Sequence, residues 1–263
     1  ARFVEEARVG GRIQSDHGVA VLAAGVDEAT SIPWLVMELL EGHDLESLVR
    51  QRGALPPAEV LDLLQQVTHA LGAAHQLGII HRDLKPENLF YARSRRRNEK
   101  HVVKILDFGI ARMVDANKAS ATVTSAIGSP LWMAPEQAQP GAKLRAATDV
   151  WALGLIAYFL LVGRNYWQAA NHATFNLSAL LVEVMTHPIV PPSARAAEVD
   201  ASVPAGFDAW FLRCVARDQD SRFVDANAAA AALGDAMRLG GPAHPRPVAP
   251  TQAMPLGSAP GLA

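Results

Sequence analysis

The stretch GIIHRDLKPENLF, residues 78–90, decides the fold because it places three chemically different side chains in one short loop. Asp83 could accept a proton, Lys85 could neutralise the charge of an anionic group during its transfer, and Asn88 could ligate a hard metal ion. The loop follows an apolar pair and has little room to separate these groups. Together they favour phosphoryl transfer.

A second acidic loop follows a run of β-branched residues. The segment VVKILDFGIAR, residues 102–112, predicts a strand that ends at Asp107 and a glycine hinge at Gly109. Mg²⁺ takes oxygen ligands, so Asp107 and Asn88 are the expected protein ligands beside substrate phosphates. Asp83 is then left to accept a hydroxyl proton, and Lys85 to stabilise the transferred phosphoryl group.

Composition indicates an ordinary soluble enzyme. The chain has 263 residues, 50% of them hydrophobic, so it can bury a sizeable core as one large domain or two lobes. Its 24 Lys and Arg against 26 Asp and Glu give a net charge of −2, which predicts no general attraction to nucleic acid or anionic lipid. The single cysteine, Cys214, is expected to be a buried thiol.

Three zones follow from composition and periodicity. Residues 1–41 predict a helix followed by a β-hairpin, and residues 42–239 are mostly helical. Apolar residues recur at helical spacing between residues 56 and 77, and the apolar run 150–163 is too short for a bilayer span of roughly 20 residues. We therefore expect it to be a buried helix. Residues 240–263 are rich in Pro, Gly and Ala and predict a disordered linker.

Three motifs in order carry a family resemblance: HRDLKPEN (81–88), DFG (107–109) and APE (134–136). This order resembles the catalytic loop, metal loop and activation-segment end of protein kinases. The residues within and around the motifs are similar to those of bacterial Ser/Thr kinases. The resemblance implies an α+β, two-lobed protein kinase-like fold with a truncated N-lobe sheet and a mainly helical C-lobe. It also implies ATP and Mg²⁺ as cofactors and a protein as substrate.

The same resemblance implies roles for further residues. Met37 would be the gatekeeper beside the adenine pocket, although it could also be core filler, and Glu5 competes with Glu6 for the ion-pairing position. The residues expected to contact the nucleotide are Glu6, Glu38, Leu40 and Phe90. The residues expected to have structural roles are His81, Glu136, Asp149 and Arg222.

Regulation is also implied. Arg82 resembles the arginine that clamps a phosphorylated activation segment, and Thr122 and Thr124 are the expected phosphate acceptors. Ser129 would place its hydroxyl beside the substrate site. We expect a cytoplasmic domain that contacts no nucleic acid and no membrane, and an anchor or sensor domain beyond residue 263 would be typical of bacterial relatives.

The sequence departs from the family at its start, where it has neither a Gly-rich phosphate loop nor a strand lysine to pair with Glu6. Two hypotheses remain: a fragment of an active kinase, or an inactive kinase-like binding module. The intact Asp83, Lys85, Asn88 and Asp107 favour the first. We expect residues 1–263 alone to show negligible transfer, and the hairpin to expose an apolar face.

Overall fold

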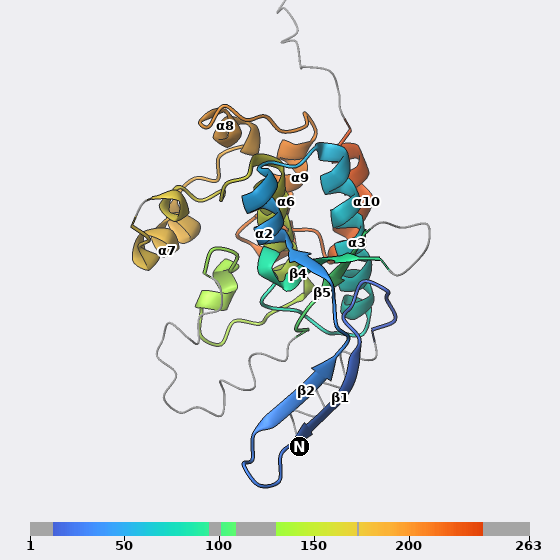
Figure 1. Ribbon diagram of the computed structural model, residues 1–263. Helices are drawn as coiled ribbons and strands as arrows, with labels where there is room; N and C mark the ends of the chain where they lie inside the picture. The colour runs from blue at the N-terminus through green and yellow to red at the C-terminus, as the bar shows by residue number, and fades with distance from the viewer. Residues whose placement is uncertain (1–12, 95–100, 109–129, 173, 239–263) are drawn as a thin grey trace, which may run out of the picture.

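The computed structural model describes residues 13–94, 101–108, 130–172 and 174–238. A β-hairpin projects from a body built mainly of helices, with a small second sheet at the junction (Figure 1). The architecture is α+β, as the sequence predicts. The proposed boundaries at residues 41 and 239 stay predictions, and the segment 240–263, expected to be a disordered linker, lies outside the described residues.

The projecting hairpin confirms the two β-rich runs. Strand β1 (Val21–Val26) pairs antiparallel with β2 (Pro33–Met37). Asp27 closes the turn by accepting hydrogen bonds from Thr30 and from the backbone N–H of Ala29, and those from Thr30 hold the pKa of this exposed carboxyl below its usual value. Large apolar side chains remain exposed on the hairpin, as expected from the sequence: Leu22, Val26, Ile32, Trp34, Val36 and Met37.

The second sheet has the order β3-β4-β5 and is antiparallel. Its strands are β3 (Gly42–Asp44), β4 (Leu89–Arg93) and β5 (His101–Ile105). The base of the hairpin is tied to this sheet because Val19 N–H donates to Ile105 O at 3.1 Å and Ile105 N–H donates to His17 O at 2.8 Å. The hairpin therefore joins the second sheet at β5, the strand that ends two residues before Asp107.

Helices make up most of the rest of the described chain. The α-helices are α2 (Leu45–Arg52), α3 (Pro57–Gln76), α6 (Ala146–Val162), α7 (Leu177–Thr186), α8 (Pro192–Ala197), α9 (Phe207–Cys214) and α10 (Ala226–Ala236). The 3₁₀ helices are η1 (Pro86–Asn88), η2 (Pro135–Ala138), η3 (Gln168–Asn171) and η4 (Gln219–Ser221).

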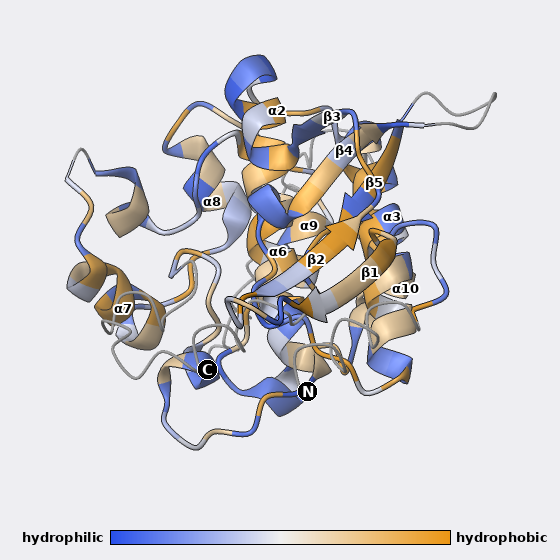
Figure 2. Ribbon diagram, turned by 60° about the horizontal axis from the view of Figure 1, so that its bottom comes forward, coloured by the Kyte–Doolittle hydropathy of each residue, from blue (hydrophilic) through white to orange (hydrophobic). Residues whose placement is uncertain are grey.

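Two of these helices were predicted from the sequence. Helix α3 matches the apolar spacing between residues 56 and 77, and it begins with Pro57, whose missing N–H costs nothing in a first turn. Helix α6 contains the long apolar run, and every residue from position 147 to position 162 is buried. Helix α6 is therefore the core of the body, with α3, α9 and α10 packed against it (Figures 1 and 2).

Candidate active site

The loop at residues 81–83 is anchored to the start of α6. Asp149 accepts hydrogen bonds from the backbone N–H groups of His81 at 2.8 Å and Arg82 at 2.9 Å. Arg82 has φ of 69°, a left-handed conformation that costs a non-glycine residue about 1–2 kcal/mol. The carboxylate of Asp149, which is 1% exposed, offsets that cost with two charge-assisted bonds.

The backbone of Asp83 is held from both sides. Its N–H donates to His81 Nδ1 at 3.3 Å, and its carbonyl accepts from Asn88 Nδ2 at 2.8 Å. Its carboxylate lies 3.1 Å from Lys85 Nζ and 3.3 Å from Asn88 Nδ2. The structure thus brings Asp83, Lys85 and Asn88 together, as the loop sequence suggests.

The second acidic loop is tied to the first through its backbone. His81 Nε2 donates to Leu106 O at 2.9 Å, since Nδ1 already accepts from Asp83. Leu106 N–H donates to Asn88 O at 2.9 Å, so the residue before Asp107 is fixed against the Asn88 backbone. Asp107 itself has φ of 54°, a turn conformation that redirects the chain as β5 ends.

The predicted adenine contacts lie on the segment that joins the hairpin to β3 and on β4. Glu38 N–H donates to Ala20 O at 2.9 Å, and its carboxylate binds Lys104 Nζ at 2.7 Å. Leu40 and Phe90 are half-buried. Met37 is 37% exposed, so the alternative that it fills the core is wrong in this structure.

The remaining structural pair is present. The guanidinium of Arg222 contacts the carboxylate of Glu136 at 2.8 Å, and both side chains are buried. Other predicted positions fall outside the described residues, namely Glu5, Glu6, Gly109, Thr122, Thr124 and Ser129, and so does the helix expected before the hairpin.

Sequence reasoning missed a histidine below the loop. His75, near the end of α3, donates from Nε2 to Asp149 Oδ2 at 2.8 Å, and its Nδ1 accepts from Ala226 N–H at 3.2 Å. It therefore connects α3, α6 and α10 underneath the loop. The only sequence signal was a polar ring at the buried end of an amphipathic helix, and that signal does not name a partner.

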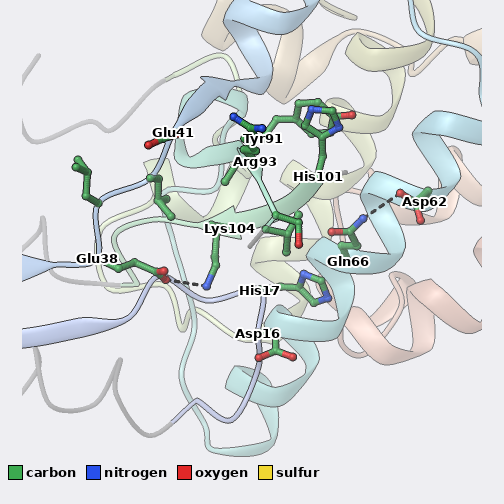
Figure 3. A pocket seen from close by; sticks show the side chains of 15 residues that line it. Asp16, His17, Glu38, Glu41, Asp62, Gln66, Tyr91, Arg93, His101 and Lys104 are labelled. Atoms are coloured by element: carbon green, nitrogen blue, oxygen red, sulfur yellow. Dashed lines mark hydrogen bonds and ion pairs between the residues drawn. The ribbon is translucent and has the colours of Figure 1, made fainter. Parts of the chain in front are cut away.

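A groove lies behind the segment 38–41, and we call it the hinge groove; two of its lining residues, Glu38 and Leu40, are among the expected adenine contacts. It encloses about 900 Å³. Glu38 reaches toward Lys104 across it, while Asp62 and Gln66 enter from α3 (Figure 3). Its lining residues are Asp16, His17, Glu38, Leu39, Leu40, Glu41, Asp62, Gln66, Tyr91, Ala92, Arg93, Ser94, His101, Val102 and Lys104. The lining does not include the predicted catalytic and metal-binding residues Asp83, Lys85, Asn88 and Asp107, so the groove is distinct from them.

Comparison with known proteins establishes the family. Residues 1–231 match the protein kinase domain model. The chain therefore belongs to the protein kinase domain family. Within the described ranges, none of the helices is both long and apolar enough to cross a lipid bilayer.

The two curated relatives compared below come from bacteria. The chain is 35% identical over 242 residues to the serine/threonine-protein kinase Pkn1 of Myxococcus xanthus, covering 90% of this chain and 33% of that protein. It is 35% identical over 233 residues to PknL of Mycobacterium tuberculosis, covering 88% of this chain and 53% of that protein. The chain thus spans about a third to a half of the length of these relatives.

Solved structures share the fold. The kinase domain of Mycobacterium tuberculosis PknI superimposes with a TM-score of 0.64 at 24% identity, over 89% of this chain and 77% of that chain. This match confirms a kinase-like α+β fold.

Proposed function

We propose that this chain is the catalytic part of a serine/threonine protein kinase, which transfers the γ-phosphoryl group of ATP to a protein hydroxyl. The observation that carries the proposal is the geometry of Asp83, whose backbone is held on both sides and whose carboxylate faces Lys85. The relatives named Ser/Thr-protein kinases support the same reading.

Each polar group has a role in this proposal. Asp83 accepts the proton of the attacking hydroxyl, and Lys85 stabilises negative charge on the phosphoryl oxygens. The hydrogen bonds of Asn88 to Asp83 engage its amide nitrogen, so its carboxamide oxygen is the atom offered to a cation. Glu38, Leu40 and Phe90 would contact adenine.

The donors fit Mg²⁺. Asn88 and Asp107 supply oxygen atoms, which this hard ion prefers. Within the described ranges, there is no group of three His, Cys, Asp or Glu side chains placed to hold a metal, so a cation here needs further ligands. Substrate phosphates provide them, and bound Mg²⁺ neutralises part of the phosphate charge.

Regulation and location belong to the same proposal. A phosphate on Thr122 or Thr124 would gain charge-assisted bonds from the exposed Arg82. The domain would act in the cytoplasm on a protein substrate, in a parent protein that carries an anchor or sensor elsewhere.

The test uses the full-length natural protein. Asp107→Asn should abolish Mg²⁺-dependent transfer, whereas Asp83→Asn should lower the single-turnover rate and leave ATP affinity nearly unchanged, because Asp83 acts on the hydroxyl. Asp235→Asn, which alters an exposed ion pair with Arg238, serves as the matched control. Nucleotide titrations and single-turnover rates measure the two effects.

The alternative function is that of an inactive kinase-like binding module. It becomes the better reading if the wild-type protein transfers no phosphate although it is folded and binds ATP. Full activity in Asp83→Asn would instead disprove the residue assignment.

A further inference from the structure

Gln137 connects the APE segment to the loop that carries Asp83. It lies in η2, one residue after Glu136, and its side chain is half-buried. Its Nε2 donates to Arg82 O at 2.6 Å, across 55 residues of sequence. Neither the family motifs quoted above nor the composition gives this residue a role.

The orientation of the Gln137 amide is fixed at both ends. Its Oε1 accepts from Ala134 N–H at 3.0 Å, which identifies the oxygen and leaves the NH₂ group to face Arg82. The segment behind it is immobilised by the buried pair of Glu136 and Arg222. The donor atom Gln137 Nε2 therefore belongs to a segment that the Glu136–Arg222 pair holds in place.

The contacted carbonyl belongs to the peptide unit that leads into Asp83. Because the peptide is planar, the Arg82 carbonyl and the Asp83 N–H move together. Gln137 holds the carbonyl, and His81 Nδ1 accepts from the N–H at 3.3 Å. With Asp149 holding the preceding N–H of Arg82, this unit has little freedom to rotate.

We propose that Gln137 is a positioning residue, which sets the orientation of Asp83 by holding the Arg82–Asp83 peptide against the APE segment. The inference rests on the proposed kinase function and extends it, because it makes the placement of this segment a condition for a correctly aimed Asp83. A misplacement of about 1 Å at a reacting group lowers rates by about 100-fold, so loss of this bond should be visible in turnover.

The discriminating variant is Gln137→Glu in the full-length natural protein. Its carboxylate keeps the acceptor for Ala134 N–H but offers no donor to Arg82 O, so the local cap stays and the link is lost. We expect kcat to fall by about 10- to 100-fold, while KM for ATP and the melting temperature stay near wild type. Gln139→Glu, an exposed glutamine two residues further on, is the matched control and should keep its activity.

The pH dependence separates positioning from simple folding. The carboxyl group introduced by Gln137→Glu can donate to Arg82 O once it is protonated. The ratio of variant to wild-type kcat should therefore rise between about pH 7.5 and about pH 5.5, toward the ordinary glutamate pKa of about 4.3. Gln137→Leu has no such proton, and its ratio should not rise.

Hydrogen exchange supplies a readout that does not depend on activity. The amide of Asp83 should exchange faster in Gln137→Glu than in wild type or Gln139→Glu. If wild type is inactive, the proposed function fails and this exchange result still decides the present inference. Unchanged exchange, unchanged kcat, or an equal loss in Gln139→Glu would each overturn the positioning role.

Discussion

The guanidinium of Arg222 donates two hydrogen bonds of 2.8 Å to the carboxylate of Glu136, which lies 86 residues away in the sequence. The side chains are 0% and 6% exposed. Arg222 also donates to three backbone carbonyls, those of Ala147, Ala216 and Arg217. All five of its N–H groups are therefore used, which only the planar guanidinium fork permits.

Replacing Arg222 by Lys should destabilise the fold strongly. An ammonium group can still pair with Glu136 but cannot reach all the other acceptors, and a buried polar group left without its partner costs about 1–3 kcal/mol. Denaturant unfolding should show a loss of this size in the free energy of unfolding. Arg238→Lys, in an exposed pair with Asp235, should change little. A comparable loss in both variants would contradict the argument.

His75→Phe should loosen the loop above it. The substitution removes the donor to Asp149 and leaves Ala226 N–H without its acceptor, at a cost of about 1–3 kcal/mol. Amides of His81 and Arg82 should then exchange faster, because both donate to Asp149. His172→Phe, at an exposed position, is the control. Wild-type exchange in the His75 variant would show that Asp149 holds the loop without it.

The sequence predicts an element correctly where the residues that define it lie close together in the chain. Helices α3 and α6 show their apolar residues within a single window, and the cluster of Asp83, Lys85 and Asn88 lies within one loop. Strand β3, with three residues, is too short for an alternating pattern and exists because it pairs with β4. It was not predicted.

The missed contacts have a common physical origin. His75 meets Asp149 across 74 residues, and Gln137 meets Arg82 across 55. Such pairs depend on how helices and loops pack, which no local periodicity encodes. The full wall of the hinge groove has the same origin, because only Glu38 and Leu40 were expected and the rest comes mainly from α3, two strands and residues 16–17.

Lowering the pH should destabilise the protein partly through His17. Burial lowers the pKa of His17 below its usual 6.5, against the opposing effect of its contact with Val103 O, and the nearby His69 lowers it further. Asp16 favours and Lys104 opposes the charged form.

The lowered pKa of His17 determines how folding stability changes with pH. The unfolded chain binds a proton at this histidine more readily than the folded chain, so stability falls as pH drops through about 6.5. The melting temperature of wild type should fall more between about pH 7.5 and about pH 5.5 than that of His17→Gln. Because all other histidines are shared, the difference between the two drops reports His17 together with its coupling to His69. Equal drops would refute its contribution.

Helix α6 packs closely against the end of α9 at Gly154. A Cβ at Gly154 would lie 2.6 Å from Cys214 Cβ and 3.3 Å from Val215 Cγ1. Gly154→Ala should therefore push the helices apart and cost about 1–3 kcal/mol, more than alanine returns through helix propensity. Gly234→Ala, in α10 with nothing within 4 Å of the new Cβ, should instead stabilise by about 0.5–1 kcal/mol.

The single cysteine reports on the same contact. Burial raises the pKa of the Cys214 thiol, so it should resist thiol reagents in the folded protein and react on unfolding. Gly154→Ala should speed its modification under native conditions, and Gly234→Ala should not. Because the clash is with Cβ rather than sulfur, adding Cys214→Ala should not restore stability to Gly154→Ala. Restoration by that second change would show that the sulfur, and not the close approach of α6 and α9, sets the cost.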